Sequence, residues 1–189
     1  YGAVLGGGQE YQGNYGKSHA ELVAFHRERI EVLASAHPDL FACETIPDLV
    51  EVQALLEVLA DYPHIPAWIT MSCKDDVHTC AGQNIAQLGR LTQEMENIVA
   101  IGVNCTMPEF VTPLFEKLRS TSAKPFVVYP NTERVWDGPN HCWIGEGLEV
   151  IPDVVVSQWV ALGAKLIGGC CGLGPVAIEK LAKDLARLR

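Results

Sequence analysis

The chain has 189 residues, 48% of them hydrophobic, and this length suits one domain with a single sizeable core better than two. Its 14 basic and 23 acidic residues give a net charge of −9, which disfavours binding to nucleic acid or anionic lipid. No apolar run approaches the ~20 residues that a membrane span needs, and residues 1–10 lack a basic segment followed by an apolar one. We therefore expect one cytoplasmic domain, residues 1–189, with no nucleic-acid or membrane partner.

The chain contains seven cysteines, an odd number whose spacing shows no small-scaffold disulfide framework. We therefore expect reduced thiols. A reduced cysteine is either a small buried hydrophobe or a thiolate ligand or nucleophile, and its position in the chain distinguishes these cases.

Hydrophobic periodicity predicts helices alternating with short apolar strands. The first helix begins near Ser18, and Pro47 suits the first turn of the second. In chain order we expect helix 17–36, strand 40–43, helix 48–60, strand 67–71, helix 84–96, strand 98–103, helix 109–119, strand 126–129, a long loop, helix 152–162, strand 164–167 and helix 176–188.

The five predicted strands are apolar nearly throughout, which is typical of an α/β protein whose parallel sheet is buried on both faces. An open doubly wound sheet and a (β/α)8 TIM barrel both fit this pattern. Polar or reactive residues directly after the strands favour the barrel, because barrel active sites collect there. These residues are Glu44, Ser72, Asn104, Pro130-Asn131 and Cys170-Cys171.

A complete barrel needs eight strand-helix units, and the pattern provides about five. The chain opens on a glycine-rich stretch, Gly6-Gly7-Gly8, that leads into a helix without a preceding strand. This stretch lacks the Lys and Ser/Thr of a P-loop, so we interpret it as a turn. We expect an N-terminally incomplete barrel whose first three units are absent.

Three cysteines follow two of the predicted strands, Cys105 after one and Cys170-Cys171 after the other. Strand ends converge in a barrel, and a catalytic zinc site keeps three protein ligands and one open position. Adjacent residues on a regular strand point to opposite faces, so the Cys170-Cys171 pair needs a turn, which its flanking glycines permit. The residues therefore predict a three-thiolate zinc site, with a vicinal disulfide between Cys170 and Cys171 as the alternative.

A thiol that binds such a site as the fourth ligand loses its proton, because zinc coordination deprotonates it. The resulting electron-rich sulfur suits attack on a carbon electrophile. Packing is the expected role of Cys43 and Cys73, and we interpret Cys80 and Cys142 as loop thiols.

At these residues the sequence resembles the homocysteine S-methyltransferase family. Two segments match its zinc-binding motifs, Gly102-Val103-Asn104-Cys105 and Leu166-Ile167-Gly168-Gly169-Cys170-Cys171-Gly172. Further matching segments are Tyr1-Gly2-Ala3, Glu10-Tyr11-Gln12-Gly13-Asn14-Tyr15, Ala42-Cys43-Glu44-Thr45-Ile46-Pro47 and Val128-Tyr129-Pro130-Asn131-Thr132. The resemblance therefore covers essentially the whole chain.

The resemblance implies a TIM-barrel enzyme that moves a methyl group to zinc-bound L-homocysteine and yields methionine. It implies Cys105, Cys170 and Cys171 as Zn2+ ligands and Glu44 as the carboxylate that meets the homocysteine ammonium group. Asn104 and Ser72 are weaker candidates for substrate binding. A solvated charge at a helix N-terminus is the competing interpretation of Glu44.

The Glu-Thr-Ile-Pro and Tyr-Pro-Asn segments resemble the S-methylmethionine or S-adenosylmethionine branch more than the betaine branch. Because the resemblance places a homocysteine-binding Asp-Gly-Gly-type loop in the absent units, we expect the 189 residues alone to be inactive. Two alternatives are a non-catalytic zinc-binding or thiol redox-sensing protein and an inactive barrel fragment.

The long loop after Tyr129 is a candidate donor pocket or lid, in which Trp136 and Trp143 either face a sulfonium cation or pack the loop. Packing is the favoured role. His78, His141 and Cys142 are conceivable zinc ligands, but none follows a strand opposite the cysteines, so we expect ordinary loop residues.

Overall fold

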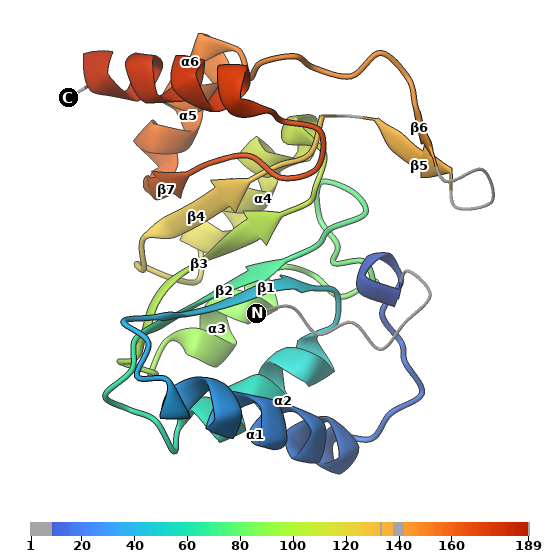
Figure 1. The fold of residues 1–189 in the computed structure, drawn as a ribbon, viewed down its shortest axis with the longest axis vertical. Helices are drawn as coiled ribbons and strands as arrows, with labels where there is room; N and C mark the ends of the chain where they lie inside the picture. Colours follow the sequence, from blue (N-terminus) through green and yellow to red (C-terminus); the bar gives the residue numbers. More distant parts are fainter. Residues whose placement is uncertain (1–8, 133, 138–141, 189) are drawn as a thin grey trace.

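The computed structural model describes residues 9–132, 134–137 and 142–188. Six helices and five parallel strands alternate along the chain, with a short 3-10 helix before them and a two-stranded hairpin between β4 and α5 (Figure 1). The main elements are α1 (His19–Ser35), β1 (Phe41–Ile46), α2 (Leu49–Leu59), β2 (Ala67–Met71), α3 (Ala86–Thr92), β3 (Ile98–Asn104), α4 (Pro108–Arg119), β4 (Phe126–Tyr129), α5 (Asp153–Leu162), β7 (Ala164–Ile167) and α6 (Pro175–Arg187). The others are η1 (Gln9–Tyr11), β5 (Val135–Asp137) and β6 (Cys142–Ile144).

The parallel sheet has the strand order β1-β2-β3-β4-β7, which is the order of these strands along the chain. A doubly wound sheet reverses its order at a switch point, whereas a barrel adds each new strand on the same side. Each helix also packs against the next one, from α1 to α6. The structure therefore confirms an incomplete (β/α) barrel and excludes the doubly wound alternative.

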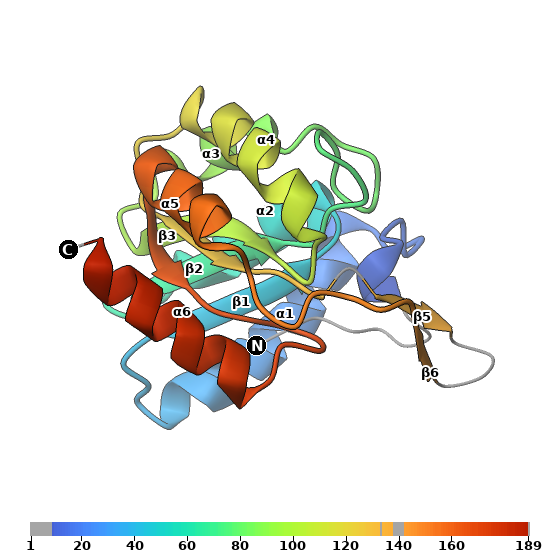
Figure 2. The same cartoon turned by 90° about the horizontal axis from the view of Figure 1, so that it is seen from above.

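The helices lie around the sheet, with α1 and α2 beside its β1 end and α5 and α6 beside its β7 end (Figures 1 and 2). Side chains alternate across each strand, so that Cys43, Ile69 and Ile101 are fully buried in the hydrophobic core. The side chains of Trp68 and Thr70 alternate with these core residues on β2 and project from the opposite face of the sheet. That face is the one on which the polar residues gather.

Helix α1 begins where the sequence predicts, at a capping box in which Ser18 accepts from the Glu21 N–H and Glu21 accepts from the Ser18 N–H. Helix α3 is shorter than the predicted 84–96. It begins only at Ala86 because the Asn84 side chain accepts a hydrogen bond from the Ala86 N–H at 2.9 Å, a turn rather than a helical contact.

Strand β1 is longer than predicted and runs to Ile46, so Glu44 lies inside a strand and not after one. The expectation of an entirely irregular loop after Tyr129 is also wrong, because β5 and β6 form an antiparallel pair there.

Residues 6–8 and His141 lie outside the described part of the chain, as do the side chains of Trp136 and Trp143. No helix within the described ranges is long and apolar enough to cross a lipid bilayer.

Gly102, in the middle of β3, shows why one of the matching motifs contains glycine. A Cβ atom at this position would overlap the backbone carbonyl of Val127 on the neighbouring β4. Any side chain at position 102 therefore pushes β3 and β4 apart.

We expect Gly102→Ala to lower the free energy of unfolding by more than about 2 kcal/mol, because strand backbones cannot move aside as a flexible side chain can. Urea denaturation measures the change. The matched control is Gly174→Ala, whose added Cβ has no atom within 4 Å and whose φ of −89° suits any residue. Equal stability of the two variants would contradict this account of the β3–β4 contact.

Candidate metal centre

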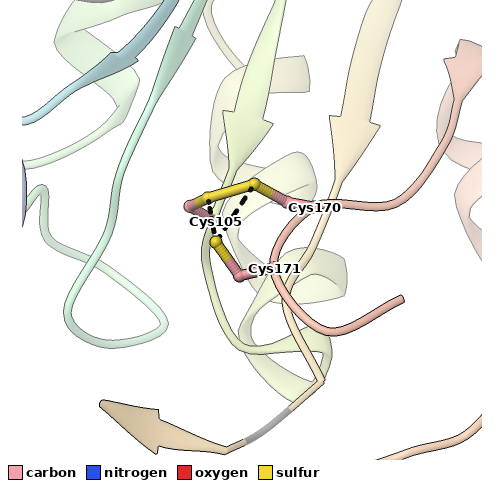
Figure 3. A group of neighbouring side chains, drawn as sticks. All are labelled: Cys105, Cys170 and Cys171. Atoms are coloured by element: carbon pink, nitrogen blue, oxygen red, sulfur yellow. Dashed lines mark hydrogen bonds between the residues drawn. A yellow bond between two sulfur atoms is a disulfide. The ribbon is translucent and has the colours of Figure 1, made fainter. Parts of the chain in front are cut away.

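The three cysteines predicted as ligands lie together beyond the carboxyl ends of β3 and β7. The sulfur atoms of Cys105, Cys170 and Cys171 all lie within 4.8 Å of one another, and they form the one such group of potential metal ligands in the described ranges. Figure 3 shows the three side chains converging from two segments that are more than 60 residues apart in sequence. Cys105 is buried, whereas Cys170 and Cys171 are half-buried.

The end of β4 holds both cysteine-bearing segments in place. The Tyr129 carbonyl accepts a hydrogen bond from the Cys105 N–H at 3.1 Å, and the Pro130 carbonyl accepts one from the Cys170 N–H at 2.8 Å. Because β4 lies between β3 and β7, adjacent carbonyls of one strand end fix the cysteines that follow the strands on either side.

Two left-handed backbone conformations turn the cysteines toward each other. Cys105 has a φ of 45°, an uncommon value for a residue with a Cβ and one that marks functional sites. Gly172 has a φ of 85°, and a Cβ there would lie 2.5 Å from the Thr132 hydroxyl oxygen. The glycine after the cysteine pair therefore provides the turn that the sequence requires.

Cys105 and Cys170 are joined by a disulfide, whereas Cys171 carries a free thiol (Figure 3). The expectation that all cysteines are reduced is therefore wrong for this pair, because the converging strand ends bring the two sulfurs within bonding reach. The alternative vicinal disulfide is absent, since the sulfurs of Cys170 and Cys171 lie 3.9 Å apart.

The donor set fits a zinc ion. With Zn–S bonds of about 2.3 Å and tetrahedral angles, two ligand sulfurs lie about 3.8 Å apart. The Cys171 sulfur lies 3.7 Å from that of Cys105 and 3.9 Å from that of Cys170. When the disulfide is reduced, the sulfurs of Cys105 and Cys170 are free to separate to the same spacing. Formation of a three-thiolate site then needs only a small movement of these two sulfurs.

The other cysteines and His78 lie outside this cluster. Cys43 and Cys73 are buried in the core, Cys142 is exposed on β6, and the His78 ring contacts the Asp75 carboxylate at 3.0 Å. The core positions of Cys43 and Cys73 agree with the packing role expected for them, whereas Cys142, expected in a loop, lies on the short strand β6.

Asn104, the residue before Cys105, is 1% exposed, and its amide group makes three hydrogen bonds. Its Oδ1 accepts from the Thr45 N–H at 2.7 Å and from the Thr70 hydroxyl at 2.8 Å, and its Nδ2 donates to the Thr45 hydroxyl at 2.6 Å. Asn104 therefore ties β3 to the residue that follows Glu44. Its direct contact with substrate stays a prediction.

Glu44 is half-buried on β1. Burial, followed by a hydrogen bond to the Glu44 carboxylate and the charge of that carboxylate, raises the pKa of the Tyr129 phenol well above its usual value. The sequence interpretation missed Tyr129, Thr70 and Trp68. A pattern in the sequence could have revealed these three residues. Each side chain can form a hydrogen bond, yet each stands in a strand that is otherwise apolar.

Ser72 is fully buried where β2 ends. Its N–H donates to the Ile46 carbonyl at 3.1 Å, and its carbonyl accepts from the Cys80 N–H at 3.0 Å. These bonds join β1 to the loop after β2. The predicted substrate contact of Ser72 remains a prediction.

Comparison with known proteins gives one consistent result. A family model described as homocysteine S-methyltransferase matches residues 1–185. The homocysteine S-methyltransferase YbgG of Bacillus subtilis is 39% identical over 182 residues, which cover 96% of this chain and 58% of that protein. The chain thus spans little more than half the length of this curated relative.

Solved structures of the homocysteine methyltransferase MmuM from Escherichia coli are similar to the chain. The metallated form has a TM-score of 0.77 and 36% identity, and the match covers 93% of this chain and 55% of that one. The oxidized form has a TM-score of 0.79 and 35% identity, covering 94% and 56%.

The cysteines differ enough in burial to be told apart by alkylation. Burial raises the pKa of Cys43 to about 12 and that of Cys73 well above its ordinary value. A thiol of pKa 12 has on the order of one thiolate in ten thousand at pH 8. We expect iodoacetamide at pH 8 to modify Cys142 and Cys171 long before Cys43 and Cys73, as measured by peptide mass spectrometry. Labelling of Cys43 as fast as Cys142 would contradict the buried position.

Proposed function

Because the chain belongs to the homocysteine S-methyltransferase family, we propose that its protein transfers a methyl group to the thiol of L-homocysteine and yields methionine, with Zn2+ as cofactor. The observation that carries this proposal is the group of three cysteine sulfurs within 4.8 Å of one another. The new S–C bond forms as the S–C bond of a sulfonium donor breaks. The donor leaves as a neutral thioether, and the thiol proton is lost.

Cys105, Cys170 and Cys171 are the proposed ligands, and the spacing of their sulfurs supports this assignment. When bound, zinc acts as a Lewis acid that lowers the pKa of the substrate thiol and makes its sulfur nucleophilic at neutral pH. The strand-end hydrogen bonds to Tyr129 and Pro130 keep the cysteines in position before substrate arrives. A cytoplasmic location agrees with this proposal, because a reducing compartment keeps thiols in the form that binds metal.

Glu44 is the proposed partner of the homocysteine ammonium group. Glu44 lies in the carboxyl-terminal half of β1, and the cysteines follow the carboxyl ends of β3 and β7 in the same parallel sheet, the end at which substrates bind in barrels. For the donor we propose S-methylmethionine or S-adenosylmethionine in preference to betaine, on the resemblance of the Glu-Thr-Ile-Pro segment at the end of β1 and the Tyr-Pro-Asn segment at the end of β4.

We also propose that the two edges of the parallel sheet, β1 and β7, pair with further strand-helix units to complete a barrel. A groove of about 840 Å³ lies between α1 and β1, and its lining includes Phe25, Leu33 and Phe41. Leu33 is 40% exposed there, and on β7 Leu166 is 43% exposed. Open edges with exposed apolar side chains are the surfaces that another strand and helix would cover.

The proposal predicts that Cys171→Ser reduces zinc content and methionine formation together, because a serine hydroxyl is a poor substitute for a thiolate ligand. Metal analysis gives zinc per chain, and chromatography gives methionine formed from homocysteine with S-methylmethionine, S-adenosylmethionine or betaine. Cys142→Ser, at an exposed position on β6, is the matched control and should behave like the unaltered protein. Full zinc occupancy in Cys171→Ser would exclude Cys171 as a ligand.

The disulfide between Cys105 and Cys170 favours a second candidate function, thiol redox sensing. Oxidation of this pair removes two of the three proposed ligands, so it would release zinc. We expect mild oxidation of the zinc-loaded protein to release the metal while forming the disulfide between Cys105 and Cys170, and thioredoxin or dithiothreitol to reverse both changes. Peptide mapping identifies the bond, and a zinc-sensitive dye follows the metal. Zinc release without that disulfide would contradict the mechanism.

A further inference from the structure

Strand β1 contains a bulge at Glu44 and Thr45. Its parallel register with β2 shifts between Cys43 and Ile46, where β1 has one residue more than its neighbour. Cys43 and Ile46 are fully buried in the core, whereas the two residues between them are half-buried. A bulge re-aims side chains and is common next to active sites. This one lies near the carboxyl end of the strand, the end that the cysteines share.

The Asn104 side chain clamps Thr45 against the inner face of the sheet, the face opposite the hydrophobic core. Its Oδ1 accepts from the Thr45 N–H at 2.7 Å, and its Nδ2 donates to the Thr45 hydroxyl at 2.6 Å. Asn104 follows the core residue Val103 on β3 and so projects from the inner face. Alternation from the buried Cys43 places Glu44 on the same face. Two adjacent residues of β1 therefore face inward.

The backbone of Thr45 is strained in this position. Its φ of 60° lies in the left-handed region, which is a rare conformation for a β-branched residue. Such strain persists only where the surrounding structure holds it, and it clusters at functional sites. The two hydrogen bonds from Asn104 provide that hold. The chain thus maintains a costly conformation that turns the Thr45 hydroxyl inward.

A chain of hydrogen bonds on this face ends at the Thr45 hydroxyl. The Trp68 indole donates to the Tyr129 hydroxyl at 3.3 Å, and the Thr70 hydroxyl lies 2.9 Å from the same oxygen. Thr70 donates its single proton to Asn104 Oδ1 at 2.8 Å, so Tyr129 is the donor to Thr70. Thr45 accepts from Asn104, and within the described ranges its own proton has no acceptor. Because chains of hydrogen bonds polarise their members, this terminal hydroxyl is a good donor.

We propose that Thr45 is a substrate-binding residue whose hydroxyl donates a hydrogen bond to the α-carboxylate of homocysteine. The inference rests on the proposed function and deepens it, because Glu44 is the proposed partner of the ammonium group of the same substrate. An α-amino acid carries both charged groups on one carbon atom, so an acceptor and a donor on adjacent residues complement it. The bulge supplies this pair, and Asn104 fixes it before substrate binds.

The test compares three thiols on the full-length, zinc-loaded protein. They are L-homocysteine, 3-aminopropane-1-thiol, which lacks the carboxylate, and 4-mercaptobutyrate, which lacks the ammonium group. Calorimetric titration gives the dissociation constant of each. We expect Thr45→Val, which keeps the β-branched shape, to weaken the two carboxylate-bearing thiols about tenfold, the value of one hydrogen bond to a charged group. The affinity for 3-aminopropane-1-thiol and the zinc content should stay unchanged.

Three further variants serve as controls. Thr45→Ser keeps the hydroxyl and should bind all three thiols like the unaltered protein. Glu44→Gln should give the opposite pattern, weakening the two thiols that carry an ammonium group and sparing 4-mercaptobutyrate. Thr121→Val is the matched control, because it removes a half-buried hydroxyl that donates to the Ala86 carbonyl at 2.9 Å, between α4 and the amino end of β4. It should change none of the three affinities.

Failure of the inference differs from failure of the proposed function. If none of the three thiols binds the zinc-loaded protein, the proposed function is wrong, and the inference with it. If the thiols bind and Thr45→Val leaves both carboxylate-bearing thiols unaffected, the inference alone is overturned. Equal weakening of all three thiols by Thr45→Val, or loss of zinc, would assign the hydroxyl a purely structural role and overturn the inference as well.

Discussion

Two adjacent carbonyl groups at the end of β4 organise the whole site. Tyr129 and Pro130 accept hydrogen bonds from Cys105 on one side and Cys170 on the other. These bonds exist only because β4 lies between β3 and β7, which is a consequence of the sequential strand order. A sheet with reversed order would place the same cysteines on separate edges. The cysteine cluster is therefore a product of topology first and of side-chain chemistry second.

Tyr129, at the same strand end, also belongs to a polar network that reaches β1 through Thr70, Asn104 and Thr45. The polar row of Trp68, Thr70, Asn104 and Tyr129 spans strands whose outward-facing residues form an ordinary apolar core. Burying so many polar groups is costly unless each has a partner, and here each of them has one. A network of this kind holds its members rigidly.

Much of this arrangement could be predicted from the sequence. Continuous apolar strands indicated a parallel sheet, and cysteines after two of these strands indicated a shared site. The left-handed conformation of Cys105, its bond to Cys170 and the polar row could not be predicted, because each depends on the distance between segments far apart in the chain. The hairpin was missed because β5 and β6 have only three residues each, too few to show a period.

The close contact between Gly172 and Thr132 limits which residues can stand beside the cysteine pair. A side chain at 172 would meet both the hydroxyl and the methyl group of Thr132, at 2.5 and 2.8 Å. A larger residue beside the cysteine pair therefore requires Thr132 to move or to be replaced by a smaller residue. The two positions, 40 residues apart in the chain, can change only together.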